Sequence, residues 1–280
     1  MPSALRFPVL IAISAIAALS SAAPAQQPEF YDVPFAPGQW NIGRTLDQSH
    51  LRYCVDERDP DWEVAVSIAD AIAAGLLLEP QQYVIESDMV REDITKVYQT
   101  LLEHCDVQMG FKLIPEGLPE WVIPTRPYYD AQYVFVTSDP DILALGDMPA
   151  GRPIGVTMGT SAHLQLLSYN TTLPADNRWP IFPMGTNDLA LQSLLNGTVV
   201  TALVWAPSLW QQQRENPEIA ALRIIDPTPL PATRLGVGGL LLAEQTYLRT
   251  AIDEAITALT ADGTIGAIID DYDFVATPAE

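Results

Sequence analysis

The stretch from Cys105 to Thr137 constrains the fold of this chain more than any other. It begins with a short strand pattern at 106–110 and ends with a longer one at 132–136. Between them lie several prolines, Trp121 and the run Arg126-Pro127-Tyr128-Tyr129. Strand patterns that flank so much proline and glycine indicate a structured loop at the edge of a sheet. We expect this loop to line a cleft, and the strand after it to cross from one lobe into a second.

Strand patterns alternate with helix patterns along the rest of the chain. Strands are expected at 51–55, 83–85, 154–158, 180–184, 199–205, 222–225 and 235–242, and helices at 62–75, 93–103, 162–169, 188–195, 206–214, 244–260 and 265–270. This alternation is typical of α/β folds with parallel sheets. The proline-rich segment 226–231 would return the chain to the first lobe. We therefore predict a two-lobed α/β clamshell with a sheet in each lobe, a discontinuous first lobe (48–137 and 232–280) and a second lobe at 138–231.

The first 25 residues have the pattern of an export signal. Arg6 supplies the positive charge, an apolar run follows at 7–19, and Ala23-Pro24-Ala25 is a small-x-small cleavage site. A membrane anchor is the weaker alternative, because a spanning helix needs about 20 apolar residues and this run has about 13. We expect cleavage near Ala25, leaving a soluble exported chain that starts with an irregular, aromatic-rich extension at 26–47.

The charge of the chain limits its partners. The formal net charge is −21, and Lys96 and Lys112 are its two lysines. Nucleic acid is not an expected partner, since binding it needs clustered Lys and Arg. An anionic membrane surface would repel the chain for the same reason, whereas a basic protein would be attracted at low salt.

Export makes the two cysteines, Cys54 and Cys105, candidates for a disulfide, with two free buried thiols as the alternative. Each lies at the edge of a short strand pattern, so the two can meet if the strands are neighbours. Two cysteines and three scattered histidines do not make a zinc site. The acidic run at 56–63 lacks the glycine and the distal glutamate of a calcium loop. We expect neither a metal nor a cofactor.

Two similar turns are candidate anion sites. Met158-Gly159-Thr160 and Met184-Gly185-Thr186 each end a strand pattern and open a helix pattern. Backbone N–H groups and a hydroxyl at such a place can bind an anion. An ordinary helix cap is the alternative. Both interpretations stay open for Thr160 and Ser161, and the cap is favoured for the second turn.

Arg126, Tyr128 and Tyr129 form a second candidate group. A guanidinium beside aromatic rings suits the capture of a carboxylate or contact with a protein. Alternatively, Arg126 pairs with one of the many carboxylates of this chain and stiffens the loop.

Trp205, at the end of a strand pattern, is expected to form part of the cleft wall, with a core position as the alternative. Asp56, which ends the first strand, and Trp62, which opens the next helix, complete the predicted cleft residues. The chain has no Gly-x-Ser-x-Gly elbow, no His-Glu-x-x-His and no phosphate loop. We predict a binding protein and no enzymatic activity.

Several of these segments together resemble the type II periplasmic solute-binding proteins of family 3. They are 51–56, Pro127-Tyr128-Tyr129, 154–161 and the closing helices around Asp262-Gly263. More narrowly, the chain resembles the branch associated with quinoprotein dehydrogenases, which accompanies periplasmic methanol dehydrogenases. The segments that carry this narrower resemblance are Cys54, 105–110, 125–129, 133–136 and 203–207.

The chain departs from that family at the groups that hold an amino acid. Amino-acid-binding members carry an acidic residue at the end of the strand that here reads Ala202-Leu203-Val204-Trp205. They also carry an arginine ahead of the Pro-Tyr-Tyr loop, where this chain has Pro119-Glu120-Trp121-Val122. The loop after the first strand is shortened to 57–61. Recognition of both the ammonium and the carboxylate of an amino acid is therefore expected to be lost.

The resemblance implies a periplasmic accessory protein of methanol utilization. It would contact a PQQ-dependent methanol or alcohol dehydrogenase, or the c-type cytochrome of that enzyme, during maturation, activation or electron-transfer assembly. The alternative is a substrate-binding protein of an ABC transporter for another small solute, such as an anion held by Arg126 and Thr160.

Overall fold

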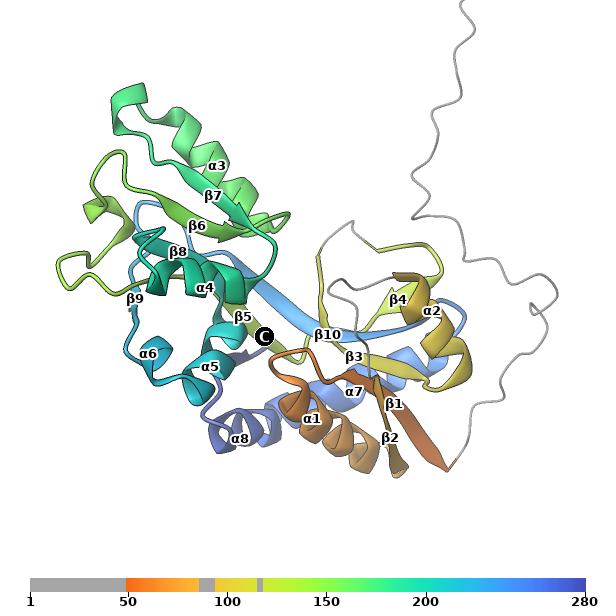
Figure 1. Cartoon of the computed structure of the whole chain (residues 1–280). Coiled ribbons are helices and arrows are strands. Elements are labelled where there is room, and N and C mark those ends of the chain that lie inside the picture. Colours follow the sequence, from red (N-terminus) through yellow and green to blue (C-terminus); the bar gives the residue numbers. More distant parts are fainter. Residues whose placement is uncertain (1–48, 86–93, 115–117) are drawn as a thin grey trace, which may run out of the picture.

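The computed structural model describes residues 49–85, 94–114 and 118–280 (Figure 1). The predicted export signal and the extension at 26–47 lie outside these residues. The elements before the middle of the chain are β1 (His50–Asp56), α1 (Trp62–Gly75), β2 (Glu79–Ile85), α2 (Ile94–Glu103), β3 (Val107–Lys112), β4 (Val122–Pro124) and β5 (Tyr129–Thr137). The middle of the chain forms β6 (Ile154–Thr157), α3 (Ser161–Thr172), β7 (Ile181–Met184), α4 (Asn187–Leu195), β8 (Thr201–Trp205), α5 (Ala206–Glu215), α6 (Pro217–Ala220) and β9 (Arg223–Ile225), with short 3-10 turns at Leu145–Asp147 and Ala175–Asn177. The closing elements are β10 (Arg234–Leu242), α7 (Thr246–Ala261), α8 (Thr264–Asp271) and β11 (Thr277–Pro278).

The strands form two groups, one in each lobe. In the first lobe the order is β2-β1-β3-β10, with β4 and β11 at the side. In the second lobe the order is β8-β6-β7, with β9 beside β5. Figure 1 shows β5 and β10 running between the two groups. The predicted two-lobed α/β fold is confirmed, while the residue boundaries given above for the lobes stay a prediction.

The two sheets are joined, in contrast to the separate sheets that we expected. Residues 129–132 of β5 pair with β10, and residues 133–137 pair with β8. Strands β1, β2 and β3 are mutually parallel, as are β6, β7 and β8. The expectation of parallel sheets fails for β5 and β10, because one strand carries the chain out of the first lobe and the other brings it back.

Apolar residues at helical spacing account for the helices that pack on the first lobe. Helix α1 buries Val64, Ile68 and Ile72 at intervals of about one turn, and α7 buries Leu248, Ile252 and Ile256 in the same way. Each such side chain stabilises the fold by about 1.5–3 kcal/mol through burial of apolar surface. The predicted helices at 62–75 and 244–260 are therefore confirmed, the second with a shift of about two residues at its start.

The predicted disulfide between Cys54 and Cys105 is present, with the two Cα atoms 5.7 Å apart. Cys54 lies in β1, Cys105 comes just before β3, and these two strands are neighbours. Both residues are fully buried against α2 and β10, in a cluster that includes Val97 and Leu240. Among the described residues, no helix is both long and apolar enough to cross a membrane.

Candidate functional site

The loop between β1 and α1 forms the first-lobe side of the candidate site, and it is held together by its own charges. The carboxylate of Asp56, which is buried at the end of β1, accepts hydrogen bonds from the backbone N–H and the guanidinium of Arg58. Trp62 opens α1 and is partly buried against the main core. Both carboxylate oxygens of Asp56 therefore accept hydrogen bonds from within its own loop.

Asp61 lies buried just before α1 and accepts a hydrogen bond from the hydroxyl of Tyr129. The neighbouring Tyr128 hydroxyl accepts a hydrogen bond from the N–H of Gly110, at 2.9 Å. Burial raises the pKa of the Asp61 carboxyl, while the Tyr129 hydrogen bond and the Lys112 ammonium act in the opposite direction. Burial also raises the pKa of both tyrosines well above the usual range, so both phenols are neutral.

Tyr128 and Tyr129 are fully buried, with their rings in an edge-to-face contact 5.2 Å apart. They therefore belong to the core beneath the site. Because neither side chain is exposed, the structure gives no support to their predicted contact with a ligand or partner.

The second-lobe side begins at the turn between β6 and α3. Thr160 caps α3: its hydroxyl oxygen accepts from the N–H of His163 at 3.0 Å and donates to the carbonyl of Thr157 at 3.0 Å. Ser161 is the first residue of α3, and its buried hydroxyl has no hydrogen-bond partner within the described ranges. The cap that we weighed for Thr160 is thus present, and the favoured cap of the second turn is confirmed at Thr186, which accepts from the N–H of Leu189.

Asn187 ties the strand ends of the second lobe together. Its side-chain oxygen accepts from the hydroxyl of Thr157 at 2.7 Å and from the N–H of Trp205 at 3.1 Å. Its side-chain nitrogen donates to the hydroxyl of Ser208. The sequence favoured a helix cap here over an anion site and did not predict this role, since a pattern of turn residues does not show which neighbouring strand an amide will reach.

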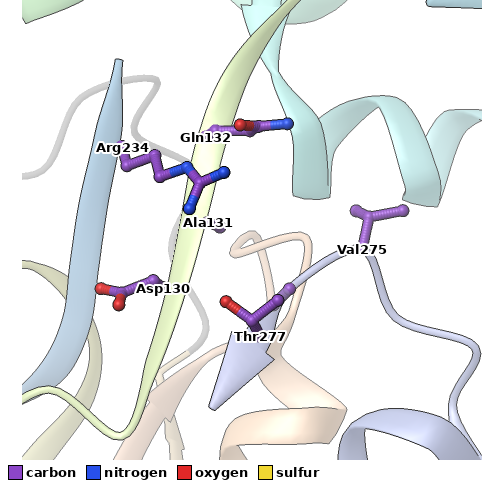
Figure 2. A pocket seen from close by; sticks show the side chains of 7 residues that line it. Asp130, Ala131, Gln132, Arg234, Val275 and Thr277 are labelled. Atoms are coloured by element: carbon purple, nitrogen blue, oxygen red, sulfur yellow. The ribbon is translucent and has the colours of Figure 1, made fainter. Parts of the chain in front are cut away.

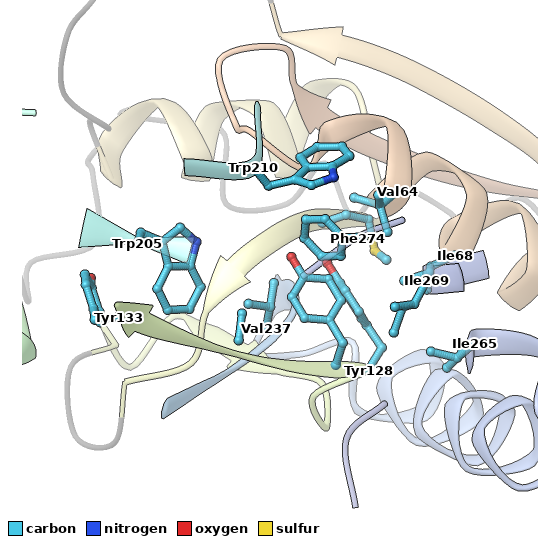
Figure 3. Packing of buried hydrophobic residues seen from close by; sticks show 14 of the residues in the cluster. Val64, Ile68, Tyr128, Tyr133, Trp205, Trp210, Val237, Ile265, Ile269 and Phe274 are labelled. Carbon is cyan, nitrogen blue, oxygen red and sulfur yellow. The ribbon is translucent and has the colours of Figure 1, made fainter. Parts of the chain in front are cut away.

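Trp205 is buried where the two lobes meet, with 1% of its surface exposed. One side of its ring packs against Tyr133, with ring centroids 5.0 Å apart (Figure 3). The ammonium of Lys112 lies 5.1 Å from the centre of the same ring. Lys112 ends β3 of the first lobe and Trp205 ends β8 of the second, so this cation–π contact joins the lobes. Trp205 therefore takes the core position that was the alternative to the predicted cleft wall, since its ring is covered by the chain itself.

A second contact between the lobes involves aromatic rings alone. The ring centroids of Trp210, in α5, and Phe274 lie 5.0 Å apart (Figure 3). Those of Phe274 and Tyr129 lie 5.3 Å apart. Phe274 belongs to the segment between α8 and β11, which then pairs with β5. Aromatic side chains thus fill the region beside the crossing strands.

Arg126 contacts helix α7 and the backbone of Glu280. Its N–H donates to the carboxylate of Asp253 at 2.7 Å, and its guanidinium donates to Thr257 of α7 and to the carbonyl of Glu280. These contacts are those of an arginine that stiffens its loop. The hydrogen bonds of Arg126 and those of Thr160 have no partner in common. That the two residues bind an anion together stays a prediction.

A shallow hollow of about 170 Å³ lies beside the crossing strands, and Trp205 is not among the residues that line it (Figure 2). It is lined by Asp130, Gln132, Arg234 and Thr277 from β5, β10 and β11, among others. Burial raises the pKa of Asp130, and the Arg234 guanidinium opposes this shift. The sequence did not point to this hollow, because β11 has no strand pattern of its own.

No family model and no curated protein matches this chain. Solved structures match over most of its length. Substrate-binding domain 2 of Lactococcus lactis GlnP, in an open conformation, is 16% identical, covers 81% of this chain and 96% of its own, and gives a TM-score of 0.61. A histidine kinase sensor domain with similarity to periplasmic binding proteins is 18% identical, with coverage of 83% and 100% and a TM-score of 0.58.

The GluR0 ligand-binding core, in complex with L-glutamate, is 14% identical, with coverage of 80% and 97% and a TM-score of 0.57. All three are binding or sensor domains, and none is described as an enzyme. At these levels of identity the similarity concerns the fold. This chain therefore has the two-lobed fold of the periplasmic binding proteins.

Proposed function

We propose that this chain is an exported, non-catalytic protein of the periplasmic-binding-protein fold that acts by contact with a protein partner and does not carry free amino acids. The observation that supports this most directly is the pair Trp205 and Lys112. By resemblance, amino-acid binders hold the ligand ammonium with an acidic residue at the end of the strand that here ends in Trp205. In this chain that position is a buried indole ring, and an ammonium of the chain itself lies against it.

The partner that the sequence resemblance implies is a periplasmic PQQ-dependent methanol or alcohol dehydrogenase, or its c-type cytochrome. The motifs around Cys54, at 105–110 and at 203–207 support this choice, and a net charge of −21 would attract a basic protein. The compared structures are not described with such a partner, so the partner rests on the motifs.

Affinity capture from periplasm tests the proposal. The mature chain, purified under oxidising conditions, is immobilised beside an unrelated periplasmic protein of similar net charge. We expect the dehydrogenase or its cytochrome to be retained by the first and not by the second after washes of increasing salt. Repeated recovery of neither protein would reject the accessory role.

A second candidate, a receptor for a small solute, is favoured by the comparisons. Several of the similar structures are described with a bound small molecule, among them the GluR0 core with L-glutamate and an ancestral arginine-binding protein with arginine. A thermal-shift screen of small carboxylates, amines and sugars tests it. A saturable rise in Tm that Thr160→Ala abolishes would establish the receptor, whereas a flat screen together with a captured partner would reject it.

A further inference from the structure

Lys112 is an unusual side chain in this protein. It is one of two lysines in a chain with a formal charge of −21, yet it lies half-buried between the lobes. Its ammonium sits 5.1 Å from the centre of the Trp205 ring. Within the described ranges, neither a hydrogen bond nor an ion pair of the Lys112 ammonium is found, so the ring face is the main contact of this group.

The surroundings of this ammonium are those of a cation site. Tyr133 packs against the Trp205 ring at 5.0 Å and so fixes the orientation of the indole. The buried Asp61 carboxyl is near enough for its charged form to be favoured by Lys112. Asp61 is itself held by the hydroxyl of Tyr129. The face of an indole ring is a common place for proteins to bind an ammonium group.

We propose that the Trp205 ring, held in place by Tyr133, forms an ammonium site between the two lobes, and that the chain fills this site with its own Lys112. The chemical class that fits the site is a primary alkylammonium ion, the group in which a lysine side chain ends. This inference rests on the proposed function and deepens it, because it states what occupies the place of a ligand ammonium.

The tether gives Lys112 an advantage over a free amine. A group on a short flexible linker has an effective concentration of the order of millimolar or more at its site. A free amine has to exceed this concentration to displace Lys112 from wild-type protein. Removing the Lys112 side chain should open the same site to a free alkylammonium ion.

The first test observes Lys112 directly. With ¹³C label at the ε-carbon of lysine, the mature chain gives two lysine signals, and exposed Lys96 provides the reference. The indole ring current should shift the Lys112 signal upfield from that of Lys96. In Trp205→Leu the shifted signal should move to the position of free lysine while the Lys96 signal stays in place. Two coincident signals in wild-type protein would overturn the proposal.

The second test fills the vacated site. Lys112→Ala, wild type and the control Lys96→Ala are titrated with n-butylammonium chloride against sodium chloride at equal ionic strength, with Tm as the measurement. We expect Lys112→Ala alone to be stabilised saturably, with an apparent Kd at least about tenfold below that of wild type, by the effective-concentration argument. The effect should be lost in Lys112→Ala/Trp205→Leu. Equal responses in Lys112→Ala and wild type would overturn the proposal.

These tests separate the inference from the proposed function. If no protein partner is captured but the Lys112 signal is shifted and butylammonium binds Lys112→Ala, only the accessory role fails. If a partner is captured and the two lysine signals coincide, only the ammonium site fails.

Discussion

Asp61 combines deep burial with a hydrogen bond from Tyr129 and a nearby ammonium. Because burial raises its pKa in the folded state above the value of about 3.9 that an unfolded chain has, the folded state keeps a proton that the unfolded state has released. Folded stability from this group is therefore present at low pH and lost as the pH rises through the folded pKa.

We predict that Asp61→Asn makes the free energy of unfolding less dependent on pH than in wild type between about pH 4 and the folded pKa of Asp61. Urea unfolding at a series of pH values measures this. The comparison with wild type cancels most of the general repulsion that a charge of −21 produces. Parallel pH profiles for the two proteins would contradict the prediction.

Trp205 should contribute to stability as well as to the contact between lobes. Trp205→Ala removes a fully buried ring, its packing on Tyr133 and its contact with Lys112, so we expect a loss of about 3–5 kcal/mol. Chemical denaturation measures this loss. The matched control is Tyr247→Ala, an aromatic residue with 84% of its surface exposed, which should change stability by about 0.5 kcal/mol or less. Similar losses for the two variants would show that Trp205 is not a packed core residue.

At the scale of elements, the disulfide ties β1 to the start of β3. Its cysteines are 51 residues apart in the sequence. In the chain-entropy account, opening a loop of that length lowers the free energy of unfolding by about 4 kcal/mol. We predict that the double variant Cys54→Ala/Cys105→Ala has a lower Tm than wild type, and that a reducing agent lowers the Tm of wild type but not that of the variant. A reductant effect of equal size on both would point to a cause other than this bond.

Elements with a long periodic pattern could be predicted from the sequence, whereas the short strands β4 and β11 could not. The spacing of Leu248, Ile252 and Ile256 was enough to place α7. The strands β4 and β11, of three and two residues, are too short to show any alternation. Their pairing depends on where β10 and β5 lie, which is a property of the assembled fold.

The candidate site could likewise be predicted only in part from the sequence. Trp205 and Thr160 could be singled out because each follows a strand pattern and precedes a helix pattern. Lys112 could not, since its contact with Trp205 depends on how two lobes come together across 93 positions of the chain (205 minus 112). Arg126 was singled out for its neighbours in sequence, but its contacts are with α7, which is formed far along the chain.

At the scale of the whole molecule, side-chain contacts among the described residues hold the lobes in one arrangement, among them Lys112 on Trp205 and Trp210 on Phe274. We predict that wild-type protein keeps its radius of gyration when amino acids are added, because neither contact needs a solute. The variant Trp205→Ala/Phe274→Ala should have a larger radius of gyration and a broader distance distribution by small-angle X-ray scattering. Compaction of wild type by an added amino acid would contradict this and favour the receptor role.

The nine residues of β5 hydrogen-bond to β10 over their first four positions and to β8 over the last five. A rotation of one lobe against the other must therefore twist the backbone near Gln132 and Tyr133, or break hydrogen bonds of a sheet. A partner protein that turns the second lobe would therefore also turn the first, because β5 is hydrogen-bonded into the sheets of both lobes.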